Sequence, residues 1–165
     1  MRLDQAVRAE VNYQRCRNGI GALSPAGGTL IASARAHSAW MAKAGKLSHT
    51  GRGASGRGLG DRIKAAGIAP TFGSENLAQL PRYRFGTQSF RVNDRRRCDF
   101  STARGQQVPP HSYASVAREV VTLWMESPGH RRNVLDRRAA RLSTAVAFSN
   151  DRNCGKLWFT QIFVR

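Results

Sequence analysis

Three polar side chains of this sequence have the chemistry that a binding or catalytic site needs. They are His49, Glu75 and His130. His49 lies among small residues, Glu75 stands between Ser74 and Asn76, and His130 follows a Pro-Gly break. Two imidazoles and a carboxylate can hold a divalent ion such as zinc, or act as a general acid and base around a water. The three residues are far apart along the chain, so spacing alone does not place them in one site.

The elements that must position these side chains are predicted from the spacing of apolar residues. Repeats of three and four residues predict helices over 3–18, 30–44 and 115–125, and a short helix over 61–67 that Asp61 caps. A turn or short helix is expected over 130–135, and a turn with a short strand or helix over 72–78. Alternating residues over 142–148 and 157–164, with turn residues at 150–155 between them, predict an antiparallel hairpin. Helices followed by a hairpin predict an α+β fold with a mostly antiparallel sheet.

The charge is the unusual feature of the composition. The 165 residues include 27 Lys and Arg against 10 Asp and Glu, a net charge of +17, and 23 of the cations are arginine. Seven arginines fall within residues 81–111, which we expect to form a basic surface excursion with a short strand at 89–93. Attraction to polyanions, with Arg95, Arg96 and Arg97 as contacts, is one explanation. A mutational bias of a GC-rich genome that leaves a solvated surface is the other.

Length, hydrophobic content and cysteine spacing disfavour several classes of protein. The length fits one domain, the hydrophobic content of 41% is ordinary for a globular chain, and no apolar run approaches the length of a transmembrane segment. Three cysteines without a CxxC pair disfavour a zinc-ribbon or thioredoxin-type motif. The first residues lack the apolar core of a secretory signal, so we expect either a cytosolic protein or a mature form without its leader.

Five motifs occur in an order that resembles a known family. They are Leu47-Ser48-His49-Thr50-Gly51, Gly60-Asp61-Arg62-Ile63-Lys64-Ala65-Ala66-Gly67, Ser74-Glu75-Asn76-Leu77-Ala78, the run from Trp124 through Ser127-Pro128-Gly129-His130-Arg131 to Leu135, and Trp158-Phe159-Thr160-Gln161-Ile162-Phe163. Together they resemble the bacterial branch of the CAP superfamily (cysteine-rich secretory proteins, antigen-five and pathogenesis-related proteins), also called SCP-like extracellular proteins. The resemblance covers nearly the whole chain and is interrupted at 81–111.

The resemblance implies an α-β-α sandwich, a mostly antiparallel sheet flanked by helices, with a central cleft. It implies one domain over 1–165, with 81–111 as a basic insertion. His49 matches the first cleft histidine, Glu75 the glutamate of the Gly-Glu-Asn motif, and His130 the histidine of the bacterial Ser-Pro-Gly-His-Arg motif. Trp158 stands where eukaryotic relatives have a second metal-binding histidine, so their metal site is complete here only if His130 substitutes. Glu126 lies at or beside their second glutamate.

The resemblance also implies an extracellular or periplasmic protein whose cleft binds a small or hydrophobic ligand or a divalent ion, zinc first, without established catalysis. The expected metal ligands are His49 and His130. The wider set of expected ligand-binding residues is His49, Glu75, Asn76, Glu126, His130, Trp158 and Gln161.

Two other functions remain open. One is a metal-dependent or acid/base hydrolase of peptidase type, with Glu75 as general base and His49 or His130 as its partner. The other is a polyanion-binding module, for which an anionic cell-surface polymer is the expected partner. Sequence-specific nucleic acid is not expected, because the aromatic residues among the arginines lack regular spacing. No serine or cysteine stands beside an evident base, so the sequence indicates no nucleophilic triad.

Several residues are predicted to be structural. An exported protein with three cysteines permits one disulfide. We favour Cys98 with Cys154 because both lie in excursions, and Cys16 at a helix end is the alternative partner. His37 is expected to be a hydrogen-bonded core histidine, and Trp40, Trp124 and Trp158 to pack in the core or the cleft wall. His111, which follows two prolines, is expected to be solvated.

Overall fold

A four-stranded mixed sheet lies at the centre of the computed structural model, which describes residues 3–87, 89–150 and 154–165. Its strand order is β1-β5-β6-β2. The strands are β1 (Ser24–Pro25), β2 (Gly73–Pro81), β5 (Arg141–Ser149) and β6 (Lys156–Val164). Both β2 and β5 pair antiparallel with β6, and the short β1 pairs parallel with β5. The predicted terminal hairpin is therefore confirmed, although part of its predicted turn, 151–153, lies outside the described residues.

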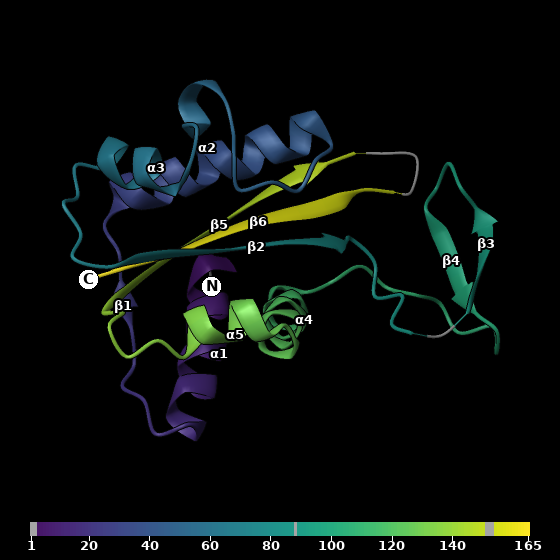
Figure 1. Cartoon of the computed structure of the whole chain (residues 1–165). Coiled ribbons are helices and arrows are strands. Elements are labelled where there is room, and N and C mark those ends of the chain that lie inside the picture. Colours follow the sequence, from purple (N-terminus) through teal and green to yellow (C-terminus); the bar gives the residue numbers. More distant parts are fainter. Residues whose placement is uncertain (1–2, 88, 151–153) are drawn as a thin grey trace.

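Helices cover both faces of this sheet (Figure 1). One face carries α2 (Gly28–Ala44) and α3 (Leu59–Ala65), with the short 3-10 turn η1 (Gly53–Ser55) beside α2. The other face carries α1 (Leu3–Arg17), α4 (Tyr113–Glu126) and α5 (Pro128–Val134). The predicted α-β-α sandwich of the α+β class is confirmed.

Each layer of helices has its own apolar core against the sheet. Val11, Val120 and Trp124 pack with Phe159 and Phe163 on the face of α1 and α4. The opposite face joins α2 and α3 to the sheet through a smaller cluster that includes Leu30, Ala34, Ile63, Ile162 and Val164. The alternation along β6 that predicted a strand thus sends apolar side chains into both layers.

The structure departs from the sequence prediction at β2 and at the start of α3. Residues 72–78 were expected to form a turn with a short strand or helix, whereas β2 is a nine-residue strand. Its polar residues Glu75 and Asn76 are both buried, so the sequence shows no alternation of polar and apolar positions. Helix α3 begins after Gly58, and Asp61 does not cap it. The Asp61 carboxylate instead accepts the backbone N–H of Arg57 at 2.7 Å.

The hairpin of β3 (Phe90–Asp94) and β4 (Asp99–Thr102), within the predicted basic insertion, lies beyond the end of the main sheet (Figure 1). These two strands pair antiparallel as their own two-stranded sheet. A disulfide between Cys98 and Cys154 ties this hairpin to the end of the main sheet. The favoured cysteine pairing is confirmed, and Cys16 is an exposed free thiol.

A buried arginine of α1 fixes the position of α5, the helix that carries His130. Nη1 of Arg15 donates to the carbonyls of Val134 and Asp136 at 2.8 and 2.9 Å, and Nε donates to Gly21 at 2.7 Å. The two bonds from Nη1 satisfy carbonyl groups at and just beyond the C-terminal end of α5, which have no partner within the helix. Within the described ranges, no helix has the length and apolar character needed to cross a bilayer.

Candidate functional site

The predicted pair of His49 and Glu75 meets at the edge strand β2. Nδ1 of His49 lies 2.9 Å from Oε1 of Glu75. The Glu75 side chain is 2% exposed, whereas that of His49 is 62% exposed. Because a carboxylate only accepts hydrogen bonds, His49 donates its Nδ1–H, and the lone pair of the neutral ring is then on Nε2. An open imidazole with a fixed tautomer results.

A buried arginine that the sequence reasoning missed holds this carboxylate. Arg62 of α3 has no solvent exposure, and its Nε and Nη2 donate to Oε2 and Oε1 of Glu75 at 2.8 and 2.7 Å. The same guanidinium donates to the carbonyls of His49 at 2.7 Å and Ser55 at 3.0 Å. Arg62 therefore fixes both the carboxylate and the loop that carries His49. Arg62 stands four residues before Ala66, which is also buried, so the two lie on the same inner side of α3. This spacing was the sequence signal that Arg62 is buried.

His37 completes the buried side of this network. Its Nε2 lies 2.9 Å from the carbonyl of Ser48, and Nη1 of Arg62 lies 3.4 Å from its Nδ1. A neutral ring that donates from Nε2 and accepts at Nδ1 satisfies both contacts. Burial, together with the charge of Arg62, lowers the pKa of His37 below its ordinary value. The ring also stacks on Trp40, so the expected core histidine is confirmed.

A second polar network lies on the other face of β2 and holds α5. Asn76 donates from Nδ2 to the carbonyl of His130 at 3.2 Å and to Oε1 of the buried Gln161 at 3.1 Å. Asn133 of α5 donates to Oδ1 of Asn76 at 2.8 Å and to the carbonyl of Glu75 at 3.2 Å. Asn133, which the sequence reasoning did not single out, therefore positions the helix of His130 against the strand of Glu75.

His130 lies beside β2 on this second side, where its backbone carbonyl accepts from Asn76. Burial lowers the pKa of His130, and His49 lowers it further when the His49 ring is protonated. Within the described chain its Nδ1 is buried without a hydrogen-bond partner. Consecutive residues of a strand point to opposite faces, and the Glu75 and Asn76 networks therefore bring the loop of His49 and the helix of His130 to the two sides of β2.

Two other expected ligand residues lie outside these networks. Glu126 is exposed at the end of α4, and none of the hydrogen bonds or ion pairs of the described residues joins it to His49, Glu75 or His130. Trp158 is 2% exposed and packs with Met41 in the core. Its Nε1 donates to Oγ of Ser149 at 2.8 Å.

The donors present fit an open metal site better than a closed one. Among residues 3–87, 89–150 and 154–165, no group of three or more His, Cys, Asp or Glu side chains is arranged to hold a metal ion. Both oxygens of Glu75 are engaged by Arg62, which leaves the imidazoles of His49 and His130 as donors. Structural zinc sites have four protein ligands and catalytic ones three. A divalent ion here would take its other ligands from solvent or a substrate.

The burial of His111 differs from the sequence prediction. This residue was predicted to be solvated, yet its side chain is 2% exposed. The ring lies against the first turns of α4, with Nδ1 3.1 Å from Oγ of Ser115. The structure thus places a serine beside an imidazole, which the sequence did not indicate.

The arginines predicted to bind polyanions lie in the turn between β3 and β4. Arg95, Arg96 and Arg97 are all exposed. Asp94 accepts the backbone N–H groups of Arg96 and Arg97, and its carboxylate lies 3.8 Å from Nε of Arg97. Most of the positive charge of this turn therefore faces solvent.

The buried pair of Arg62 and Glu75 predicts strong energetic coupling. Replacing either residue by Met leaves the other charge buried alone, so Arg62→Met and Glu75→Met should each lower the free energy of unfolding by roughly 3–5 kcal/mol. The double variant should cost much less than the sum, because no unpaired charge remains. Urea denaturation of the four proteins measures this coupling. Additive costs would show that the two residues do not act as a pair.

Comparisons with known proteins agree with this architecture. A model of the cysteine-rich secretory protein family, CAP, matches residues 8–163. Among solved structures, an extracellular protein containing an SCP domain from Bacillus anthracis strain Ames has a TM-score of 0.65 at 20% identity; the match covers 99% of this chain and 40% of that chain. An outer surface protein from Borrelia burgdorferi has a TM-score of 0.60 at 13% identity, with 98% of this chain and 91% of that chain covered.

These comparisons establish the family and the fold of the chain. No curated protein matches the chain. At identities of 20% and 13% the structural matches show the fold alone, and this chain spans less than half of the Bacillus anthracis protein. The family model extends over nearly all of the sequence. The chain therefore belongs to the cysteine-rich secretory protein (CAP) family.

Proposed function

We propose that this chain is an exported CAP-domain protein whose cleft beside β2 binds a small ligand or a divalent metal ion through the imidazoles of His49 and His130. The observation that carries this proposal is the 2.9 Å contact between Nδ1 of His49 and Oε1 of Glu75. Arg62 clamps that carboxylate, so the tautomer and the ring plane of His49 are set before any ligand arrives.

This site offers nitrogen lone pairs on two imidazole rings. Nε2 of His49 carries one, and burial lowers the pKa of His130, which favours its neutral ring. Such a lone pair can accept a hydrogen bond from an N–H or O–H group of a small ligand. It can also bind a divalent ion. The buried Nδ1 of His130 has no hydrogen-bond partner in the described chain, which is the kind of group that a bound ligand satisfies.

The surroundings of His49 also suit a metal. Histidines that bind metals commonly donate their other ring N–H to a carboxylate, which orients the ring and raises its basicity. Glu75 is in this position relative to His49. Zinc, which accepts imidazole nitrogen readily, is the ion that we expect first, and a bound ion would supply Lewis acidity.

A peptidase-like hydrolase would use the same residues in different roles. Glu75 gains no support as the general base, because its oxygens already accept hydrogen bonds from Arg62 and His49. His49 is then the remaining base of the cleft, with Glu75 as its orienting partner. Simple binding requires fewer assumptions than turnover and is the function we propose.

Export is supported by the structural neighbours and by the disulfide. The two similar structures are described as an extracellular protein and an outer surface protein. Disulfides such as Cys98–Cys154 persist in oxidising compartments, which include both the extracellular space and the periplasm.

Zinc titration tests the proposed cleft. The Cys16→Ser background removes the exposed free thiol, which is itself a zinc ligand. Calorimetry in this background should show about one ion bound per chain at micromolar zinc, lost in His49→Ala and weakened at least about tenfold in His130→Ala. Glu126→Gln, at an exposed residue outside both networks, is the matched control and should bind normally.

Two results would count against the metal site. Zinc binding that survives in His49→Ala would place the ion elsewhere on the chain. An absence of binding at micromolar zinc would leave only an organic ligand for the cleft.

A second function is favoured by the exposed turn of Arg95, Arg96 and Arg97. Their charge belongs to a chain of net charge +17 and lies on a hairpin outside the main sheet. An anionic cell-surface polymer is the partner that this charge fits, because such binding needs accumulated charge and no shaped pocket.

Heparin, as a model polyanion, tests this second function. Affinity should fall steeply with salt, and the triple change of Arg95, Arg96 and Arg97 to Gln should reduce the slope of log K against log salt by roughly 3. The matched control changes three exposed helix cations, Arg17, Arg35 and Lys43, to Gln and should keep more of the slope. Equal losses in the two variants would assign the binding to net charge and not to the hairpin.

A further inference from the structure

A group of polar side chains separate from the cleft lies at the start of α4. His111 precedes Ser112, the N-cap residue of the helix, and His111, Ser115 and Glu119 follow one another at a spacing of four residues. Nδ1 of His111 is 3.1 Å from Oγ of Ser115, and Nε2 is 3.5 Å from Oε2 of Glu119. A hydroxyl, an imidazole and a carboxylate in this order are the parts of an activated serine.

The ring of His111 is arranged to accept a proton from Ser115. Nε2 of His111 has no hydrogen-bond partner among the described residues, and Oε2 of Glu119 at 3.5 Å is the carboxylate oxygen that it faces. With the ring proton on Nε2, the lone pair of Nδ1 is directed at the Ser115 hydroxyl. Burial lowers the pKa of His111; the charge of Glu119 opposes this shift and that of Arg84 adds to it. The Ser115 hydroxyl has a second acceptor, the carbonyl of Ser112 at 3.0 Å.

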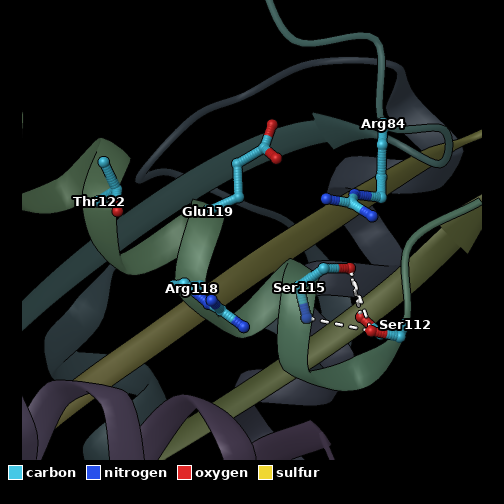
Figure 2. Close-up of a pocket in the computed structure, with 6 residues that line it drawn as sticks. All are labelled: Arg84, Ser112, Ser115, Arg118, Glu119 and Thr122. Carbon is cyan, nitrogen blue, oxygen red and sulfur yellow. Dashed lines mark hydrogen bonds between the residues drawn. The ribbon is translucent and has the colours of Figure 1, made fainter.

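This serine opens onto a polar cavity of about 450 Å³, shown in Figure 2. The residues that line it are Arg84, Ser112, Ser115, Arg118, Glu119 and Thr122. In this view the guanidinium of Arg84 lies between the side chains of Glu119 and Ser115. None of the ion pairs of the described residues includes Arg84 or Arg118. Free guanidinium groups attract an anionic substrate and stabilise negative charge that develops beside the serine.

An apolar cavity of about 460 Å³ adjoins the polar one. It shares Ser112 with the polar cavity, and its apolar lining includes Val116, Phe148 and Leu157. The buried ring of His111 lines it as well. A polar, cationic cavity beside an apolar one suits a molecule that joins an anionic part to an apolar part.

We propose that Ser115 is a nucleophile activated by His111 and Glu119, and that it hydrolyses esters of an apolar acyl group with an anionic alcohol. Oγ of Ser115 attacks the ester carbonyl carbon while its proton passes to Nδ1 of His111. The bond from carbon to the alcohol oxygen breaks, and His111 returns the proton to the departing alcohol. Water then cleaves the acyl-serine by the same route, which releases the carboxylic acid and restores Ser115.

A fluorophosphonate probe tests this assignment without knowledge of the natural substrate. The intact protein should form one adduct, which peptide mass spectrometry places on Ser115. Labelling should be absent in Ser115→Ala and slower by about 100-fold in His111→Gln, because the hydroxyl loses its base. Ser89→Ala, at an exposed serine outside the cavity, should label at the normal rate.

The outcomes separate catalysis from helix capping. If Ser115 serves only the start of α4, the intact protein will not react with the probe, or His111→Gln will label at the normal rate, and either result overturns the proposal. Should Ser115→Ala fail to fold, the location of the adduct in the intact protein and the rate for His111→Gln decide the question. Zinc binding at His49 is independent of all these results.

Discussion

Arg62 and Glu75 form a charged pair in the interior of the protein, and the position of His49 depends on this pair. Removing two charges from water costs several kcal/mol per ion unless good hydrogen bonds replace the lost hydration. Here the guanidinium makes two bonds to the carboxylate and two to the carbonyls of His49 and Ser55. The same pair therefore holds α3, β2 and the loop of His49 in one arrangement, and His49 receives its tautomer from it.

The edge strand β2 carries polar residues of the site on both of its faces. Glu75 and Asn76 are neighbours in sequence, but they lie on opposite faces of the strand. Glu75 fixes an imidazole from the loop beside α3, whereas Asn76 and Asn133 fix the helix that carries the second imidazole, His130. An outer strand is suited to this task, because one of its edges has no neighbouring strand in the main sheet.

The sequence predicted those parts of the fold that apolar periodicity controls and missed those that buried polar groups control. The terminal hairpin and the long helices follow from apolar spacing, and motif resemblance brought His49 and Glu75 together. Strand β2 was not predicted as a full strand, because two buried polar residues interrupt its pattern. The spacing of Arg62 indicated the inner side of α3 but not its partner Glu75, and Asn133 was missed because a hydrogen-bond partner cannot be read from spacing. His111 was misjudged, since the two prolines before it suggested a solvated excursion, whereas its ring packs against α4.

The proposed site requires that the His49 ring, in its neutral form, carries its proton on Nδ1, held by a carboxylate that Arg62 fixes. Long-range proton–nitrogen NMR of the histidine rings at about pH 8, where ordinary imidazoles are neutral, measures this directly. We expect a single tautomer for His49, with a protonated Nδ1 and an unprotonated Nε2. A spectrum with the proton on Nε2, or an even mixture of the two forms, would contradict this expectation.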